Sequence, residues 1–451
     1  MIDLAIIGAG PAGYVAAEKA AKAGLDTVLF EKKTLGGVCL NEGCIPTKTL
    51  LYSAKMYDNA RHSQKYGITA EGVTANFGAI QKRKTKVVRK LTGGIKVRMR
   101  EAGVQVVEGE AYIEGTIDGR GARISCNGEI YECRNLLICT GSQAAVPPIP
   151  GLEPENILTN REILELDHIP ETLTTIGGGV IGMEFASFFC SMGTKVTVIE
   201  MLPEILGGLD PEISAMLRDV YAKKGVEFHL SCRVTSLEGK DVIYETPDGE
   251  TCRACSEQVL LSVGRRATLK GYGLENLGVE AQRGIKVDSH MRTNIPGVYA
   301  AGDVTGFSLL AHTASREAEV AVADILGIDD EMSYDAIPGV VYTNPEVAGV
   351  GLTEQQALDR GIEYDVVKLP MQYSGRFVAE NEGGEGICKI LARKGGAEVL
   401  GVHMMGNYSS EIISTACLAV SGAMSVKKLL RTVLPHPSVS EILKETAGAL
   451  V

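Results

Sequence analysis

The sequence predicts an α/β protein with two Rossmann-like dinucleotide-binding domains followed by a C-terminal α+β domain. Two observations predict the nucleotide-binding domains: an apolar strand that runs into a glycine-rich turn at the start of the chain, and a second copy of this pattern at 174–200. A third observation predicts the last domain, because strand-like stretches at 336–351 are followed by helix-like stretches after 352 and 409. We place the boundary of that domain near residue 335.

The first glycine motif lies in "LAIIGAGPAG", which precedes the helix-like "YVAAEKAAKAG" and a second strand, "TVLF". Gly8 makes the tight turn, Gly10 lets the backbone approach a pyrophosphate, and Gly13 lets the helix pack closely on the strand. The N-terminus of the helix adds partial positive charge. Glu31 ends the second strand, where its carboxylate can accept hydrogen bonds from a ribose diol. Strand, turn, helix, strand and acid in this order predict dinucleotide binding.

The second copy reads "TTIGGGVIGMEFASFFCSMGTKVTVIE", with Gly177, Gly179 and Gly182 in the turn and Glu200 as the terminal acid. In both copies the acid lies 23 positions after the first glycine. No arginine or lysine occurs in "MLPEILG" after Glu200, and a carboxylate there would repel a 2′-phosphate, so NAD is favoured over NADP. Two dinucleotides on one chain indicate electron transfer between them.

Three further strand ends fit the same architecture. "NLLICTGS" and "QVLLSVGRR" are apolar stretches that stop at Gly141 and Gly264, and we expect them to be closing strands of the two nucleotide domains. "GVYAAGDV" leads to Asp303, whose carboxylate can hold a cofactor hydroxyl group or, alternatively, cap a helix.

Two cysteines lie five residues apart in "GGVCLNEGCIPTK". Cys39 and Cys44 can be packed apolar residues, metal ligands or a redox pair, but a metal site needs two further ligands and none lies nearby. A helix over 44–52 would place Cys44 at its N-terminus, where the helix dipole lowers the pKa of a thiol. Lys48 would then lie one turn further along the same face.

Charge and composition exclude several classes of function. The 451 residues carry a net charge of −11, with a pI near 5.3, which argues against a general binder of nucleic acid or anionic membranes. We see no apolar run long enough to span a membrane and no signal peptide, so we expect a cytoplasmic protein. Eleven cysteines, an odd number at irregular spacings, indicate that any disulfide is catalytic rather than structural.

Two other patterns are interpreted as surface structure. The basic block "QKRKTKVVRK" at 81–90 is expected to be a solvated helix face, although a docking patch is the alternative. The CxxC in "CRAC" at 252–255 has no partner CxxC, so we expect a surface hairpin rather than half of a metal site or a redox pair.

The chain resembles a known family over essentially its whole length. "GGVCLNEGCIPTK" is similar to the redox-active disulfide segment of the flavin-dependent pyridine nucleotide–disulfide oxidoreductases, and "GAGPAG", "GGGVIGME", "VYAAGDV" and "LLAHTASREA" follow in that family's order. Among its members, the chain is most similar to those that oxidise protein-bound dihydrolipoamide with NAD⁺. The resemblance implies an FAD-binding domain in 1–145 that is completed by 268–334, an NAD-binding domain in 146–267 and a dimerisation domain in 335–451.

The resemblance also assigns the chemistry. Cys39 is implied to be the thiol that exchanges with substrate and Cys44 the thiol that passes electrons to FAD, which in turn reduces NAD⁺. The segment "PHPSVSE" matches the family pattern His-Pro-x-x-x-Glu, so His436 is implied to be the base and Glu441 the carboxylate that holds it. Both are expected to act on the thiols of a partner subunit, which makes the homodimer necessary for activity. Lys48 is implied to pair with Glu184 beside the flavin.

The remaining cofactor positions come from the same resemblance. The residues implied to hold FAD are Gly8, Gly10, Gly13, Glu31, Lys48, Ala111, Gly141, Ser142, Asp303 and Ala311. The residues implied to hold NAD are Gly177, Gly179, Gly182, Glu200, Val234 and Gly264. No metal is expected.

The sequence also departs from the usual pattern of this group. Val38, Glu42, Thr47 and Leu434-Pro435 replace common residues, and Glu42 can oppose thiolate formation if it faces the cysteines. A glutathione-type reductase remains an alternative, although Val180 stands where those enzymes usually have tyrosine. A mercuric reductase would carry a C-terminal cysteine pair, and a nonenzymatic flavin- or nucleotide-binding module would have inert thiols. The expected partner is a lipoyl-bearing carrier of a 2-oxoacid or acetoin dehydrogenase complex or of the glycine cleavage system.

Overall fold

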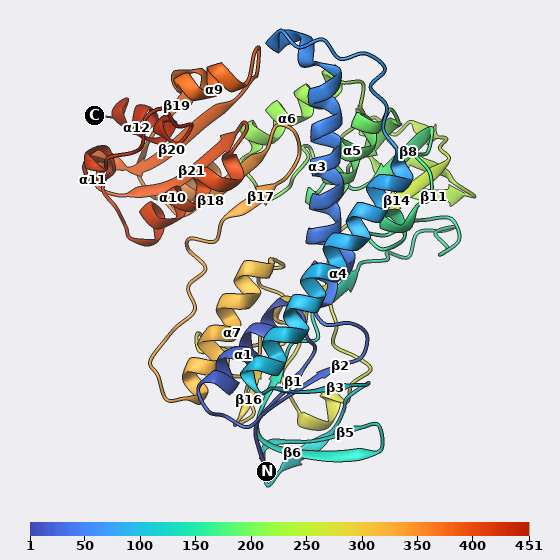
Figure 1. Cartoon of the computed structure of the whole chain (residues 1–451), viewed down its shortest axis with the longest axis vertical. Coiled ribbons are helices and arrows are strands. Elements are labelled where there is room, and N and C mark those ends of the chain that lie inside the picture. Colours follow the sequence, from blue (N-terminus) through green and yellow to red (C-terminus); the bar gives the residue numbers. More distant parts are fainter. Residues whose placement is uncertain (451) are drawn as a thin grey trace. The chain divides into compact units, whose positions relative to one another are not determined.

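The computed structural model describes residues 1–450 and divides into two compact units (Figure 1). Unit 1 comprises 1–49, 81–146 and 264–333, and unit 2 comprises 50–80, 147–263 and 334–451. The division falls within helices α3 (Cys44–Arg61) and α4 (Phe77–Ala102). The domain boundaries expected from the sequence stay predictions.

Unit 1 is built on a seven-stranded sheet in the order β3-β2-β1-β6-β5-β4, with β16 also paired to β6. Strands β3, β2, β1, β6 and β16 are parallel neighbours, whereas β4, β5 and β6 form an antiparallel meander. The strands are β1 Ile2–Ile7, β2 Thr27–Glu31, β3 Gln105–Glu108, β4 Tyr112–Ile117, β5 Arg120–Cys126, β6 Glu129–Ile138 and β16 Val298–Ala300. A separate ribbon pairs β7 (Ser142–Ala144) with β15 (Arg265–Ala267).

The central strands of unit 1 are apolar because both of their faces are covered. Leu4, Ala5 and Ile6 of β1 are fully buried, and Leu136 and Ile138 of β6 pack into the same sheet. Full burial of one such aliphatic side chain contributes about 1.5–3 kcal/mol. Helix α1 (Pro11–Lys22) packs against α7 (Ala311–Ile325), and the two lie together in Figure 1. The short helix α2 spans Gly37–Glu42.

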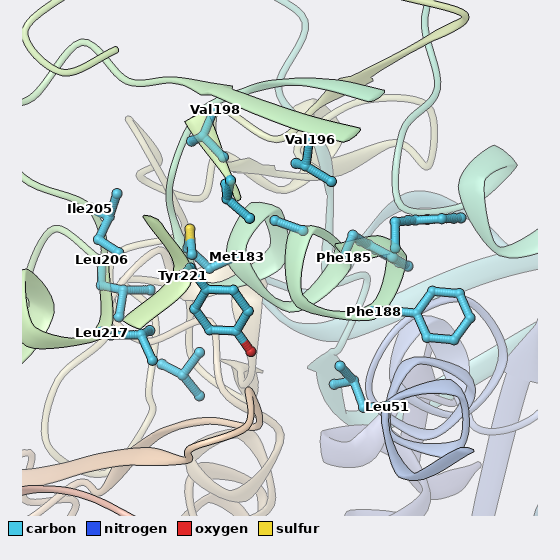
Figure 2. Packing of buried hydrophobic residues seen from close by; sticks show 14 of the residues in the cluster. Leu51, Met183, Phe185, Phe188, Val196, Val198, Ile205, Leu206, Leu217 and Tyr221 are labelled. Atoms are coloured by element: carbon cyan, nitrogen blue, oxygen red, sulfur yellow. The ribbon is translucent and has the colours of Figure 1, made fainter. Parts of the chain in front are cut away.

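Unit 2 contains a second parallel sheet in the order β10-β9-β8-β14. This order repeats the order β3-β2-β1-β6 of unit 1. The last strands of the two series, β6 and β14, are the closing strands that the sequence predicted. The strands are β8 Thr172–Ile176, β9 Lys195–Ile199, β10 Glu227–His229 and β14 Gln258–Leu261, and the helices are α5 Val180–Met192 and α6 Pro211–Lys223. Figure 2 shows the core between them, where Met183 and Phe185 of α5 lie near Val196 and Val198 of β9.

An antiparallel meander accompanies this second sheet. It joins β11 (Arg233–Glu238), β12 (Asp241–Glu245) and β13 (Thr251–Ala254). The cysteines of "CRAC" lie at its edge, Cys252 half-buried on β13 and Cys255 exposed just beyond it, as expected for a surface hairpin.

The C-terminal part of unit 2 is an antiparallel five-stranded sheet in the order β17-β18-β21-β20-β19. Helix α10 packs on β18 and β21, and α12 packs on β19 and β20. The strands are β17 Gly339–Val341, β18 Val347–Gly351, β19 Tyr364–Pro370, β20 Ile387–Arg393 and β21 Val399–Met405. The helices are α8 Glu354–Asp359, α9 Gly375–Glu380, α10 Ser409–Ser421, α11 Val426–Arg431 and α12 Glu441–Gly448. The α+β character predicted for this region is confirmed.

Single turns of 3₁₀ helix complete the structure: η1 Ser63–Tyr66, η2 Glu162–Glu165, η3 Leu274–Leu277, η4 Asp303–Thr305, η5 Met371–Tyr373 and η6 Lys394–Gly396. The basic block lies on α4 as predicted, with Lys82, Lys86 and Arg89 exposed, although Lys84 is buried. None of the helices within residues 1–450 combines the length and the apolar character required to cross a bilayer.

Candidate active site

The first glycine turn joins β1 to α1, and two of its three glycines, Gly8 and Gly13, have a steric reason. Gly8 has a φ of 99°, and a Cβ there would lie 2.4 Å from the carbonyl oxygen of Cys139. A Cβ on Gly13 would lie 1.8 Å from the carbonyl oxygen of Gly8, so the helix packs against the turn at this point. Gly10 is the N-cap of α1, and a Cβ there would meet no atom within 4 Å. The open N-terminus of α1 can therefore receive a phosphate group.

The second glycine turn, between β8 and α5, repeats this geometry. Gly177 has a φ of 100°, and a Cβ on Gly182 would lie 2.2 Å from the carbonyl oxygen of Gly177. Gly179 is the N-cap of α5 and, like its counterpart in unit 1, faces open space. Two helix N-termini in this chain are thus built in the same way to accept an anion.

The two strand-end acids are also held alike. Each carboxylate accepts one backbone N–H from its own glycine turn and one from the residue two positions beyond the acid. The four bonds are Ala9 N to Glu31 Oε2 at 2.8 Å, Lys33 N to Glu31 Oε1 at 2.8 Å, Gly178 N to Glu200 Oε2 at 2.6 Å and Leu202 N to Glu200 Oε1 at 2.7 Å. Because a carboxylate has about four lone-pair sites, each acid can still accept hydrogen bonds from a ribose diol. The residues present therefore fit a dinucleotide at both turns.

A glycine-to-alanine substitution is expected to affect a different cofactor in each of the two turns. Gly13→Ala is expected to prevent cofactor binding in unit 1 and to give a colourless protein, because the added methyl group overlaps the backbone of the turn. Gly182→Ala is expected to leave the flavin bound but to weaken NAD⁺ binding by about tenfold or more. Absorbance at flavin wavelengths and calorimetric titration with NAD⁺ measure the two effects. A yellow Gly13→Ala protein with normal flavin content would contradict the assignment.

The thiol segment packs directly on the first glycine turn. Gly36 donates its N–H to the carbonyl oxygen of Ala9 at 2.8 Å. A Cβ on Gly37 would lie 2.6 Å from the Cα of Gly10. The two glycines of "GGVC" therefore allow the chain that carries the cysteines to lie against the N-terminus of α1.

Both cysteines lie at helix positions in unit 1. Cys39 is on α2, and Cys44 is the first residue of α3, as the sequence predicted. A hydrogen bond to Cys44 is the main cause that raises the pKa of Cys39, followed by burial and by the charge of Cys44, while Lys48 opposes the shift. Cys44 lies at the N-terminus of α3, where the helix dipole favours a thiolate.

A cluster that the sequence did not predict surrounds Asp303. Ser142 donates from Oγ to Asp303 Oδ2 at 2.5 Å, and Arg265 donates from Nε to Ser142 Oγ at 2.7 Å. The guanidinium group of Arg265 also bonds to the carbonyl oxygen of Ser142 at 2.7 Å. Gly302 is the N-cap of η4 and Asp303 is its first residue, so Asp303 does not occupy the N-cap position that the alternative required. The only sequence signal for Arg265 was its position directly after Gly264.

The other predicted cofactor residues lie at turns and element ends. In unit 1, Ala111 is buried just before β4, and Ala311 begins α7. Gly141 and Gly264 have φ angles of 68° and 109°. In unit 2, Val234 lies on β11. Their contacts with cofactors remain predictions.

The predicted base lies in unit 2, between α11 and α12. His436 Nδ1 lies 2.9 Å from Glu441 Oε1, and Glu441 Oε2 accepts the N–H of Ser438 at 2.8 Å. The hydrogen bond from Ser438, and then that from His436, lowers the pKa of Glu441. The His436 side chain is 80% exposed, so the ring is oriented by the carboxylate while its Nε2 edge faces away from Glu441.

The expected pairing of Lys48 with Glu184 joins residues of different units and remains a prediction. Glu184 is buried on α5, and its Oε1 accepts the N–H of Tyr342 at 3.1 Å. Within residues 1–450 no group of three or more His, Cys, Asp or Glu side chains is arranged to hold a metal ion.

Comparison with known proteins identifies the family. Residues 2–318 match the pyridine nucleotide-disulphide oxidoreductase model, and residues 337–447 match the dimerisation domain of the same family. This chain belongs to the pyridine nucleotide-disulphide oxidoreductases. Its cofactors are FAD and NAD.

Curated relatives are similar over their whole length. A dihydrolipoyl dehydrogenase of Geobacillus stearothermophilus is 39% identical over 452 residues, which cover 98% of this chain and 94% of the relative. One from Bacillus subtilis (strain 168) is 39% identical over 459 residues, covering 100% and 96%.

Solved structures of the family share the fold. LpdA from Mycobacterium tuberculosis has a TM-score of 0.90 at 27% identity, with 100% of both chains covered. The HOCl-induced flavoprotein disulfide reductase RclA from Escherichia coli has a TM-score of 0.86 at 27% identity, with 99% of both covered.

Proposed function

We propose that this chain oxidises protein-bound dihydrolipoamide to lipoamide and reduces NAD⁺ to NADH, the activity of a dihydrolipoyl dehydrogenase. The observation that carries the proposal is the packing of the Cys39–Cys44 segment on the first dinucleotide turn, through Gly36 and Gly37. The thiol segment would therefore adjoin a dinucleotide cofactor held at that turn, and such a cofactor would supply a two-electron acceptor. The names of the curated relatives support dihydrolipoamide as the substrate.

The side chains supply the thiol chemistry. His436, oriented by Glu441, accepts the proton from one substrate thiol. The substrate thiolate attacks Cys39 of the Cys39–Cys44 disulfide, and the S–S bond breaks as Cys44 leaves as a thiolate stabilised by the N-terminus of α3. The second substrate thiol then attacks the substrate sulfur of the mixed disulfide, which forms the S–S bond of lipoamide and breaks the bond to Cys39. The proton of that thiol passes to Cys39, which is released as a thiol. Bound FAD supplies the two-electron transfer from the reduced thiol pair to NAD⁺.

The assignment of subunits is also part of the proposal. The exposed imidazole of His436 and the family's dimerisation domain at 337–447 support a homodimer in which His436 acts on the thiols of the partner subunit. The substrate arm would be carried by a lipoyl-bearing protein of a 2-oxoacid or acetoin dehydrogenase complex or of the glycine cleavage system. The odd number of cysteines, eleven, favours the cytoplasm, where structural disulfides are rare.

Thiol counting tests the redox pair, and substrate comparison tests the reaction. With eleven cysteines in the chain, we expect nine titratable thiols in the denatured oxidised protein and eleven after anaerobic reduction by NADH. Steady-state rates with dihydrolipoamide and NAD⁺ are expected to exceed those with NADP⁺, and those with NADPH plus glutathione disulfide, by at least about 10²-fold. Eleven thiols in both states would mean inert cysteines, and a preference for glutathione disulfide would replace the proposed substrate.

A further inference from the structure

Unit 2 contains a buried ion-pair cluster around Lys389. Lys389 of β20 is only 3% exposed, and its Nζ lies 2.8 Å from Asp210, 2.6 Å from Glu354 and 3.2 Å from Glu212. Burial alone would lower the pKa of Lys389, but its hydrogen bonds to Asp210 and Glu354 reverse the shift and raise it. The ammonium group is therefore held charged in the interior, which requires a specific arrangement of its partners.

Asp210 connects this lysine to the start of α6. Its side chain is 1% exposed, and Oδ1 accepts the backbone N–H groups of Glu212 at 3.1 Å and Ile213 at 3.3 Å, as an N-cap does. Its second oxygen, Oδ2, accepts a hydrogen bond from Lys389. One carboxylate thus fixes the first turn of α6 to a strand 179 residues further along the chain.

The 201–209 loop runs from Glu200 to Asp210 and lies on the second glycine turn. Leu206 donates its N–H to the carbonyl oxygen of Gly178 at 2.9 Å, and Gly178 in turn donates to Glu200 at 2.6 Å. A Cβ on Gly178 would lie 3.0 Å from the side chain of Ile205. The loop therefore contacts both the glycine turn and the acid that is expected to hold the NAD ribose.

The conformation of this loop needs support from its surroundings. Leu206 has a φ of 55°, a left-handed conformation that non-glycine residues adopt at a cost. Ile205 and Leu206 are both buried, and Figure 2 shows them beside Met183 and Leu217 in the core of unit 2. Apolar packing holds the middle of the loop, the carboxylate of Glu200 holds its start, and the Asp210–Lys389 pair holds its end.

We propose that Lys389 is a positioning residue for NAD: its ion pair with Asp210 fixes the end of the 201–209 loop and thereby the position of Glu200 and the second glycine turn. This inference rests on the proposed function in that the second turn must bind NAD. A methionine at 389 keeps much of the volume but leaves the carboxylate of Asp210 buried without its cation. Movement of Asp210 toward water then displaces the loop that contacts Gly178.

The test measures NAD⁺ binding without turnover. Calorimetric titration of NAD⁺ into the oxidised, FAD-loaded full-length protein, with no dithiol present, gives Kd for the wild type, Lys389→Met, Asp210→Asn and the double variant. We expect each single variant to raise Kd by about 3- to 30-fold. The Kd of the double variant should not exceed that of the weaker-binding single variant, because both substitutions remove the same Asp210–Lys389 interaction. Reduction of the thiols by dihydrolipoamide should stay within about twofold of wild type.

Lys368 provides a matched control in the same cluster. It is 39% exposed and pairs with Glu212 but not with Asp210, so Lys368→Met is expected to leave Kd within about twofold of wild type. An unchanged Kd in both Lys389→Met and Asp210→Asn, or additive effects in the double variant, would overturn the proposal. Loss of flavin or of the folded state in both single variants would also overturn it, since Lys389 would then act on stability. A wild-type protein that binds no NAD⁺ would instead remove the proposed function.

Discussion

Replacement of Cys44 by serine is expected to lower the rate of dihydrolipoamide oxidation by at least about 10³-fold while FAD stays bound. Serine cannot form the disulfide that the substrate must open. It also carries no sulfur that could leave as a thiolate stabilised by the N-terminus of α3. Flavin absorbance and NAD⁺-dependent turnover, measured on the same preparation, separate the loss of chemistry from the loss of the cofactor.

Cys39→Ser should cause a loss of similar size by a different route. Cys44 would remain at the N-terminus of α3, but no sulfur would be present at position 39 to form a mixed disulfide with the substrate. Cys255→Ser is the matched control, because Cys255 is an exposed thiol that follows β13 in the meander of unit 2. Turnover within about twofold of wild type is expected for that variant. Substantial activity in either Cys39→Ser or Cys44→Ser would exclude a disulfide relay.

The features that sequence could predict are those fixed by local chain geometry. Each glycine turn, its helix and its acid lie within one β-α-β unit, where steric contacts such as that of Gly13 with Gly8 leave only glycine. The contact of His436 with Glu441 is also local, since five residues and the start of α12 bring the two side chains together. The position of Cys44 at a helix start followed in the same way from residues near it.

Contacts between segments that are far apart in the sequence could not be predicted from local geometry. Ser142 and Arg265 lie 123 residues apart, and their hydrogen bond depends on how β7 pairs with β15. Lys389 could not be selected from the sequence, because nothing near it identifies Asp210 as its partner. The packing of Gly37 on Gly10 likewise requires both turns to be placed in space. These contacts depend on the tertiary structure and have no local sequence signal.

The second large effect concerns His436, whose replacement by glutamine is expected to lower turnover by about 10²- to 10⁴-fold through loss of the base. If the base acts on the partner's thiols, two inactive chains can form one intact site. In a heterodimer of a Cys39→Ser chain with a His436→Gln chain, one site carries both defects and the other carries none. Such a heterodimer, purified through two different affinity tags, should therefore show about half of the wild-type turnover.

The matched control places both substitutions on one chain and pairs it with a wild-type chain. Shared sites then each contain one defect, so this second heterodimer should be inactive, whereas sites built within single chains would leave it about half active. The two heterodimers carry the same substitutions in the same number, so differences in folding or flavin content cannot produce opposite results. We expect the first heterodimer to be about half active because the ring of His436 is exposed and is oriented by Glu441. An inactive first heterodimer beside a half-active second one would show instead that each chain forms its own site.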